Sequence, residues 1–282
     1  MLSTLLTCPI DGTPLSSIDK QLQCSQGHHF DISRQGYINL LPVQHKKSKN
    51  PGDTKAMLAV RTAFLNTGFY HQIANQLNQL AIEYLPESHS FSTLDAGCGE
   101  GYYFDHFFNS LPQQPISSQP NEYIGLDISK FAIDAASRRN KAITWVVGSN
   151  KNPPVKAESI DLIFCTFGFY HFAGFKKILK PGGIVILTEA APNHLIQLRK
   201  IIYPEVKQST LPDISQATEM GYQLLTTQSL SYDIDLNNHQ LMNLLQMMPH
   251  FYKSKQAGKA TAKKTELLRC SVDVNFRVLK LM

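Results

Sequence analysis

The sequence lacks any apolar run that approaches the roughly 20 residues needed for a membrane-spanning helix. Its first residues also lack the basic segment and the cleavage site of a secretory signal. Cysteine is scarce and odd in number, with 5 among 282 residues, which argues against a disulfide framework. These absences predict a cytoplasmic protein with no membrane partner, in which cysteines that lie close together would bind a metal.

Charged residues make up only 17% of the chain and hydrophobic residues 43%, so a sizeable core can form. The net charge of +5 favours a polyanionic partner without requiring one. A length of 282 residues accommodates one α/β domain of roughly 200 residues and a small module. We therefore expect two unequal domains and consider nucleic acid as a partner.

Short apolar segments alternate with helical patterns along most of the chain, as in βαβ units. Strands are predicted at residues 92–95, 123–127, 143–147, 160–165 and 184–189, and helices between them at 102–109, 130–139 and 174–179. With right-handed crossovers, such strands form a parallel, doubly wound sheet. A later pair of strands around a helix should extend the sheet at one edge, at 222–234, 238–248 and 272–281.

A glycine-rich segment, Asp95-Ala-Gly-Cys-Gly-Glu-Gly101, lies directly after the first strand and before a helical pattern. Glycine lets the backbone approach a ligand closely and adopt a positive φ. The spacing differs from the Gly-x-Gly-x-x-Gly of dinucleotide sites, and the acid that ends the strand suits a cationic sulfonium ligand. The second strand also ends in an acid, Asp127, from which a carboxylate accepts both ribose hydroxyls of an adenosine.

A third feature, Lys180-Pro-Gly-Gly183 before the fifth strand, is common in class I methyltransferases. The glycine segment alone would be read as an ordinary strand-to-helix turn, but the three features in order favour a Rossmann-like class I methyltransferase fold. The predicted cofactor is S-adenosylmethionine, bound by Asp95, Gly97, Gly99, Gly101 and Asp127. The end of the third strand is expected at the edge of the adenine, through Ser149 and Asn150.

The first forty or so residues contain two halves of a possible metal site, Cys8-x-x-Asp11 and Cys24-x-x-x-His28. A structural zinc ion needs four tetrahedral donors from two turns, and this spacing nearly supplies them. Asp11 stands where a thiolate would be expected, since carboxylates are uncommon at structural zinc, and His29 offers a substitute donor. The alternative is that metal binding has been lost and the module is held by packing of Phe30, Tyr37 and Leu40.

Several segments together resemble one family: Gly36-Tyr-Ile-Asn-Leu-Leu-Pro-Val-Gln-His-Lys-Lys-Ser48, Pro51-Gly-Asp53, Cys98-Gly-Glu-Gly-Tyr-Tyr103, Gly125-Leu-Asp-Ile-Ser-Lys130, Lys180-Pro-Gly-Gly183 and Leu245-Gln-Met-Met-Pro249. With them, nearly the whole chain resembles the RlmA-type guanine-N1 methyltransferases of large-subunit (23S) ribosomal RNA. The resemblance implies an α/β, Rossmann-like class I methyltransferase sheet with a small N-terminal zinc-ribbon-like module. It implies methylation of guanine N1 in a 23S hairpin, and a homodimer.

The resemblance also assigns roles to residues and segments. Zinc would be held by Cys8, Cys24 and His28, with Asp11 in place of the second family cysteine. Cofactor contacts would come from Tyr70, Gly99, Glu100 and His194. Without the resemblance, Tyr70 would be an aromatic on a helix face and His194 a polar residue near a helix start. The chain would divide into an RNA-recognition module at 1–43, a basic linker with helices at 44–85 and a methyltransferase domain at 86–282.

Transfer to guanine N1 requires a base turned out of its stack and loss of the N1 proton. After the fourth strand, Phe167 or Tyr170 could stack on a base and His171, the one catalytic candidate, could accept a proton. The alternative is that Phe167 and Phe169 lie in the core and His171 is merely exposed. Cys165 lacks the preceding proline of cytosine-C5 enzymes and need not be a nucleophile.

Basic side chains could follow a phosphate backbone, although each alone is an ordinary surface charge. They are Lys46, Lys47, Lys49, Arg61, Lys253, Lys255, Lys259, Lys263 and Lys264. Two other functions stay open at this point. One is a small-molecule class I methyltransferase, whose fold signature would be the same, and the other is a non-catalytic RNA-binding protein.

Overall fold

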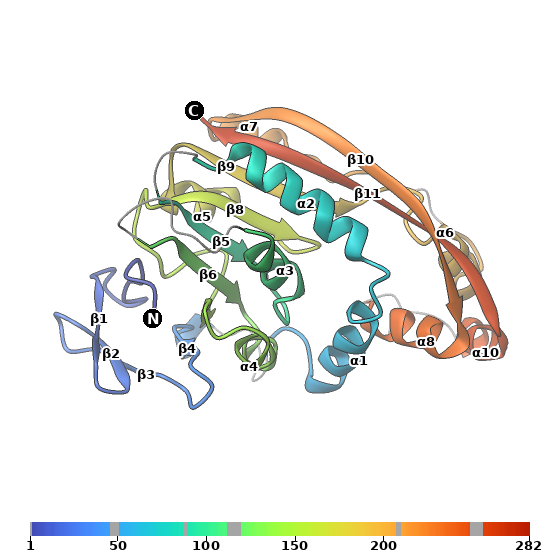
Figure 1. The fold of residues 1–282 in the computed structure, drawn as a ribbon, viewed down its shortest axis with the longest axis horizontal. Coiled ribbons are helices and arrows are strands. Elements are labelled where there is room, and N and C mark those ends of the chain that lie inside the picture. Colours follow the sequence, from blue (N-terminus) through green and yellow to red (C-terminus); the bar gives the residue numbers. More distant parts are fainter. Residues whose placement is uncertain (1, 46–50, 87–89, 112–119, 207–209, 249–255) are drawn as a thin grey trace.

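The computed structural model describes residues 2–45, 51–86, 90–111, 120–206, 210–248 and 256–282. Figure 1 shows a large twisted sheet with helices on its faces and a small sheet beside it, close to the N-terminus. The small sheet is antiparallel and contains β1 (Leu15–Ile18), β2 (Gln21–Cys24) and β3 (His29–Asp31). Within the described ranges, no helix has the length and apolar character needed to cross a membrane.

Five neighbouring parallel strands form the centre of the eight-stranded main sheet. In order across the sheet they are β9 (Leu179–Ala190), β8 (Ile160–Thr166), β5 (Ser92–Ala96), β6 (Glu122–Asp127) and β7 (Thr144–Val147). All five predicted strands are confirmed. The chain winds outward from β5 through β6 to β7 and then returns to β8, so strand order reverses between β5 and β8. Ligands of open α/β sheets bind outside the carboxyl ends of the strands at such a point.

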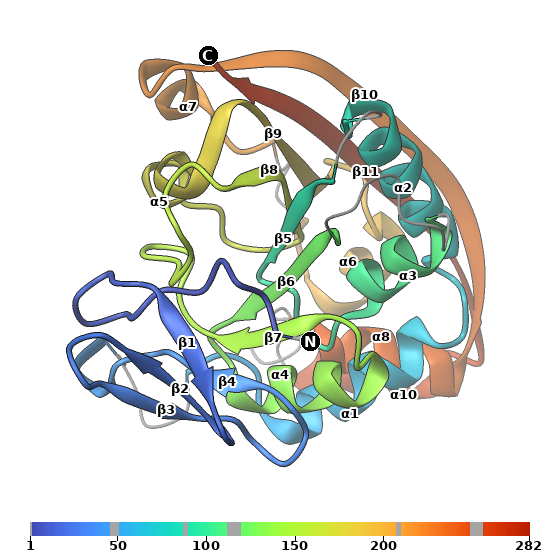
Figure 2. The same cartoon turned by 60° about the vertical axis from the view of Figure 1, so that its left-hand side comes forward.

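Both edges of this parallel region are extended. β11 (Leu267–Leu281) lies between β9 and β10 (Tyr222–Asn237) and is antiparallel to both, which confirms the expected pair of strands. At the other edge, β4 (Ile38–Asn39) pairs in parallel with β7, as Figure 2 shows. The backbone N–H of Ser3 also donates to Oγ1 of Thr144 at 2.8 Å. The amino-terminal module is therefore continuous with the main sheet through β4.

The helices pack on both faces of the sheet. One buried apolar cluster joins it to α1, α2, α3, α4, α6 and α8, and a second joins its other face to α5 and the amino-terminal module. The predicted helices at 102–109, 130–139 and 238–248 are confirmed. The helices of the described residues are α1 (Lys55–Leu65), α2 (His71–Tyr84), α3 (Tyr102–Ser110), α4 (Lys130–Arg139), α5 (Phe172–Ile178), α6 (Ile196–Ile202), α7 (Ser215–Glu219), α8 (Asn238–Met247) and α10 (Gln256–Lys264), with a 3-10 turn at Val43–His45.

Trp145 on β7 fixes the packing around the glycine-rich loop. The indole is fully buried, and its N–H donates to the carbonyl of Asn140 at 2.7 Å. A Cβ placed on Gly125 would lie 2.2 Å from this ring, and one on Gly101 would lie 2.7 Å from it. Both glycines are thus required because the indole fills the space beside them. The single tryptophan of the chain is the partner that holds the end of the loop against β6 and β7.

We predict that Trp145→Ala lowers the free energy of unfolding by about 3–5 kcal/mol, because it leaves a large cavity between β6, β7 and the loop. Urea denaturation followed by circular dichroism measures the change. Phe131→Ala is the matched control, since Phe131 on α4 is 39% exposed and its loss should change stability by about 0.5 kcal/mol or less. Equal effects of the two substitutions would show that the indole does not have this role.

Candidate active site and metal centre

The glycine-rich loop turns between β5 and α3 with three residues in the left-handed region. The φ angles of Gly97, Gly99 and Gly101 are 87°, 56° and 82°. Asp127, at the end of β6, accepts hydrogen bonds from the backbone N–H of Gly99 at 3.0 Å and of Ser129 at 2.7 Å. Its carboxylate therefore joins the loops that follow two adjacent strands. Each oxygen keeps a further lone pair, so the group can still accept from a bound diol.

Unsatisfied polar atoms collect at the carboxyl ends of three neighbouring strands. Among the described residues, Oδ1 of Asp95 and the hydroxyls of Thr166 and Thr188 are buried without a hydrogen-bond partner. Thr166 and Thr188 are paired in register across β8 and β9. Because unpaired buried polar atoms are rare in folded proteins, their grouping points to a polar ligand at this edge. No sequence motif indicated the two threonines.

Asp95 has the electrostatics of a site for a cationic group. Burial is the main cause that raises the pKa of its carboxyl to about 8, and the nearby negative charge of Asp127 adds to it. Burial also raises the pKa of Asp127, while its bonds from Ser129 and Gly99 oppose the shift. Two buried acids side by side favour a ligand that brings a positive charge.

These groups fit S-adenosylmethionine, which carries a diol, an ammonium group and a sulfonium. Asp127 would hold the ribose, and Asp95 would face the charged methionine part. A Cβ on Gly97 or Gly99 would have no neighbour nearer than 3.8 Å, so the surface of the loop is open to a ligand at both positions. Gly101 differs, because the Trp145 ring accounts for glycine there.

Glu100 ties the loop to α4. Oε2 of its buried carboxylate accepts two hydrogen bonds from Arg139, one from Nε at 2.8 Å and one from Nη2 at 2.5 Å. Oε1 is buried without a partner among the described residues, so Glu100 can still accept a bond from a ligand. Burial raises the pKa of Glu100, and the Arg139 charge opposes that shift.

Tyr70 and His194, 124 residues apart in sequence, meet in the fold. Nδ1 of His194 accepts the backbone N–H of Asp273 at 3.2 Å, and its Nε2 lies 3.3 Å from the Tyr70 hydroxyl. Burial lowers the pKa of His194 to about 4, so the ring is neutral. Since Nδ1 accepts, the proton is on Nε2 and is donated to Tyr70. The hydroxyl hydrogen of Tyr70 is then directed away and is available to an acceptor.

The loop after β8 brings aromatic side chains to the same place. The Phe167 ring centre lies 6.3 Å from Tyr70 and 5.9 Å from His194. Phe167 is 42% exposed and Phe169 94% exposed, so neither belongs to the core. Cys165 is buried and its pKa is raised by burial, which keeps it a thiol, as expected of a residue that is not a nucleophile.

His171 caps the start of α5. Its Nδ1 accepts the backbone N–H of Gly174 at 3.0 Å, and α5 begins at Phe172, two residues before the predicted start. This bond uses the free lone pair of the neutral ring and places the proton on Nε2. Acceptance of a proton by His171 would therefore require the cap to break.

Near Asp127, a strap from residues 51–53 lies against the loop after β6. A Cβ on Gly52 would lie 2.8 Å from Cβ of Ser129, and the Ser129 hydroxyl donates to the carbonyl of Asp53 at 3.0 Å. The Asp53 carboxylate pairs with Arg61 of α1, whose Nη1 lies 3.8 Å from the Cβ position of Gly99. Arg61, which was predicted to contact a phosphate, is therefore paired with Asp53 of the protein itself. The sequence indicated the strap only as part of the family resemblance.

Asn150 reaches the same region from the end of β7, where its Nδ2 donates to the carbonyl of Phe169 at 2.8 Å. Ser149 accepts the backbone N–H of Lys151 at 3.2 Å.

Of the basic residues proposed to contact RNA, Lys259, Lys263 and Lys264 lie on α10. Lys46, Lys47, Lys49, Lys253 and Lys255 lie outside the described residues.

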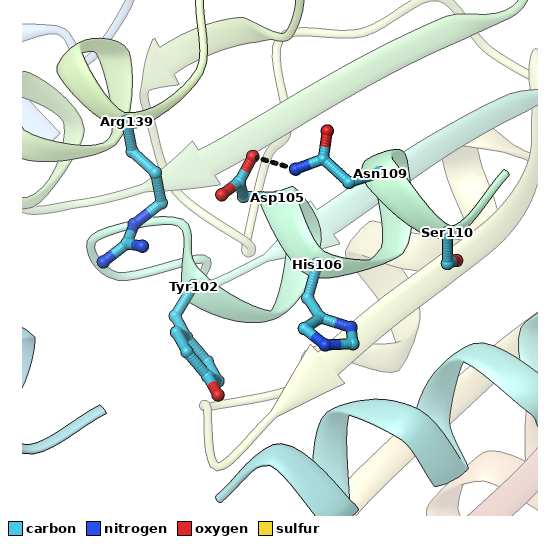
Figure 3. Close-up of a pocket in the computed structure, with 6 residues that line it drawn as sticks. All are labelled: Tyr102, Asp105, His106, Asn109, Ser110 and Arg139. Atoms are coloured by element: carbon cyan, nitrogen blue, oxygen red, sulfur yellow. Dashed lines mark hydrogen bonds between the residues drawn. The ribbon is translucent and has the colours of Figure 1, made fainter. Parts of the chain in front are cut away.

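A separate pocket of 240 Å³ opens on the outer side of α3 (Figure 3). Asp105 accepts there from Asn109 and from Asn140, both at 2.9 Å. His106 is bonded to Asn78 at 2.8 Å and to His71 at 3.1 Å. Asp105 and His106 are therefore engaged by other side chains of the protein, although Oδ1 of Asn78, beside His106, is buried without a partner among the described residues.

The four predicted metal ligands converge in the amino-terminal module. One ligand atom from each of Cys8, Asp11, Cys24 and His28 lies within 4.8 Å of the others. Nδ1 of His28 lies 3.5 Å from Sγ of Cys8 and 3.4 Å from Sγ of Cys24, close to the separations of about 3.5 Å that tetrahedral zinc imposes. Thr13 binds Oδ1 of Asp11 through its N–H at 2.8 Å and its hydroxyl at 2.5 Å.

Oδ2 of Asp11 is left to face the cluster, 3.3 Å from Sγ of Cys24. The set fits one structural zinc ion, whose four positions would all be filled by protein. His29 points elsewhere, with its Nε2 3.3 Å from Nε2 of Gln23. Asp11, and not His29, therefore occupies the fourth corner of the cluster.

Two family models match the chain. The model described as a methyltransferase domain matches residues 94–187, from β5 to β9. With the strand order and the cofactor loop, it makes this protein a class I S-adenosylmethionine-dependent methyltransferase. The model described as "RlmA, N-terminal", a zinc ribbon, matches residues 6–49. The chain thus joins an RlmA-type zinc ribbon to a methyltransferase domain.

Three relatives carry related names. The chain is 24% identical over 280 residues to YxjB of Bacillus subtilis strain 168, whose name assigns it provisionally to the 23S rRNA (guanine-N1)-methyltransferases, with 98% of this chain and 96% of YxjB covered. It is 29% identical over 194 residues to the 23S rRNA (guanine(748)-N(1))-methyltransferase of Streptomyces fradiae, with 68% and 66% covered. A Micromonospora griseorubida protein with a provisional name of the same kind is 28% identical over 210 residues, and 68% of each chain is covered.

We predict that Asp11→Ala lowers zinc affinity by about tenfold or more, because even supporting residues of metal sites contribute about that much. Asp11→Cys should retain or strengthen binding. Zinc released to a chromogenic chelator and zinc content by mass spectrometry measure both effects. Asp31→Ala is the control, since Asp31 is an exposed acid of the same module that bonds to Gln21. Unaltered zinc retention in Asp11→Ala would exclude Asp11 as a ligand.

We predict that cofactor binding near pH 7 releases a proton from Asp95. With a pKa of about 8 the free carboxyl is mostly protonated, and a cationic ligand lowers that pKa. Affinity should therefore rise with pH up to about pH 8 and then level off. Calorimetry in buffers of different ionisation enthalpy counts the protons. Asp95→Asn should bind without this release, and an identical pH dependence in both proteins would contradict the assignment.

Proposed function

We propose that this protein transfers a methyl group from S-adenosylmethionine to N1 of a guanine in a hairpin of 23S ribosomal RNA, in the cytoplasm. The observation that carries the proposal is the fusion of an RlmA-type zinc ribbon to the methyltransferase sheet through β4 and β7. The names of the relatives support the same substrate. A small-molecule methyltransferase would have no use for the ribbon.

The proposed division of labour follows the chain. Residues 1–43 form the RNA-recognition module, residues 44–85 the linker with α1 and α2, and residues 86–282 the methyltransferase domain. The ribbon would read the shape of a folded hairpin, as proteins commonly do with structured RNA. We also propose a homodimer that offers two such modules, which rests on the family resemblance alone.

S-adenosylmethionine supplies, when bound, a methyl group on a positively charged sulfur. In the proposed reaction the methyl group would pass from that sulfur to guanine N1, S-adenosylhomocysteine would leave, and the N1 proton would pass to water. Asp127, Asp95 and the loop glycines would hold the donor, and the hydroxyl of Tyr70, positioned by His194, would donate to the donor's carboxylate. Phe167 would stack on the guanine and hold N1 in line with the methyl group.

The experiment that tests the function is mass mapping of 23S rRNA from cells with and without the gene. The rRNA from the cells without the gene is then methylated in vitro with the purified protein. The expected result is one N1-methylguanosine that disappears with the gene and returns with purified protein.

Asp127→Asn should weaken cofactor binding by about tenfold to a hundredfold, the usual loss for a hydrogen bond to a charged group.

An unchanged N1-methylguanosine pattern in the deletion strain would refute the proposal. Methyl transfer to a metabolite fraction but not to rRNA would favour the small-molecule alternative. Binding to rRNA without S-adenosylmethionine affinity would favour the non-catalytic one. Each outcome has a separate readout, so the three functions are distinguishable with one preparation of the protein.

A further inference from the structure

The loop after β8 holds two phenylalanines in opposite environments. Phe167 contacts Tyr70, Tyr103 and His194, with ring centres 5.9 to 6.3 Å apart. Phe169, two residues later, is 94% exposed, more than any other large apolar residue described. Single exposed apolar residues are common on protein surfaces, so the interest of Phe169 lies in its position, in the loop that borders the candidate active site.

The protein holds the backbone on both sides of this exposed ring in place. Phe167 adopts a φ of 52°, unusual for a residue other than glycine, and its N–H donates to the carbonyl of Thr188 at 2.9 Å. The carbonyl of Phe169 accepts from Asn150, and His171 begins α5 just beyond. Strained backbone that the surroundings hold in place is typical of functional loops.

The loop is also pressed against the cofactor loop. A Cβ on Gly168 would lie 3.2 Å from the carbonyl oxygen of Ala96 and from Sγ of Cys165. The Cβ position of Gly97 lies 3.8 Å from Cα of Gly168. The turn that separates the two phenylalanines is therefore in van der Waals range of the turn that would bind the methyl donor.

Guanine N1 lies on the edge that pairs with another base, so a guanine in a hairpin stack must turn out before it can react. When the base turns out, its neighbours lose their stacking contacts with it. Some nucleic-acid-binding proteins insert an apolar side chain between the bases at such a step. Phe167 has the place of a platform for the extruded base, while Phe169 points outward to the stack that the base has left.

We propose that Phe169 is a wedge that inserts into the RNA stack and takes the place of the extruded guanine. This inference rests on the proposed function. Phe169 is a positioning residue, because it touches neither the methyl donor nor the reacting nitrogen. Phe169 would occupy the vacated step of the hairpin. Other parts of the protein would contact the surrounding phosphates.

The test compares Phe169→Ala with wild type on two RNAs: a hairpin that contains the mapped guanine, and a single-stranded oligonucleotide of the same local sequence. On the hairpin, Phe169→Ala should lower kcat/KM by about tenfold or more, the usual loss per removed stacking contact. On the single strand, where no stack has to open, the two proteins should differ by about twofold or less. Phe169→Trp should restore the hairpin rate.

A fluorescent readout reports extrusion directly. With 2-aminopurine in place of the target guanine, wild type should raise the fluorescence of the hairpin and Phe169→Ala should not. S-adenosylmethionine affinity should be equal in both proteins. Leu267→Ala is the matched control, since Leu267 is 77% exposed at the start of β11 and should behave as wild type in every assay.

The outcomes separate the inference from the function on which it rests. If wild type methylates neither RNA, the proposed function fails and the wedge with it. If wild type is active and Phe169→Ala retains its hairpin rate, or loses equally on both RNAs, the wedge is refuted while the function stands. A loss confined to the hairpin, with the fluorescence change abolished, supports the wedge.

Discussion

Two acids buried side by side govern the architecture of the candidate active site. Asp95 and Asp127 end adjacent parallel strands, and each carboxylate disfavours the charge of the other. The protein meets this cost with backbone N–H groups at Asp127 and leaves Asp95 only partly satisfied. A cationic ligand that binds beside these acids offsets the unfavourable burial of their charges, so the pair favours the methyl donor.

The rest of the site surrounds that pair. Arg139 holds Glu100, the indole of Trp145 fills the space beneath Gly101, and the strap at 51–53 lies beside Ser129. These three contacts come from α4, from β7 and from the strap, yet all press on the loops that follow β5 and β6. The site is therefore rigid where it would bind the donor, and its aromatic, exposed part is the loop after β8.

Much of this was predictable because it is local. Each parallel strand is an apolar run between turn residues, and the acids and glycines at its end are neighbours in sequence. The contact between Tyr70 and His194 and the grouping of the threonines at the strand ends depend on register and on packing across the sheet, which no local pattern encodes. Asp11 was an intermediate case. Its spacing placed it in the metal site, but only the fold shows Thr13 turning its second oxygen toward the other ligands.

The pairing of β4 with β7 has a consequence for how the chain is made. Ser3 is bonded to Thr144, 141 residues further along, and Ile38 pairs with Val146. During synthesis the ribbon leaves the ribosome well before β7, the strand on which it docks, because the two are far apart in sequence. A bound metal would let those early residues fold alone in the interval, protected from wrong partners until the sheet edge arrives.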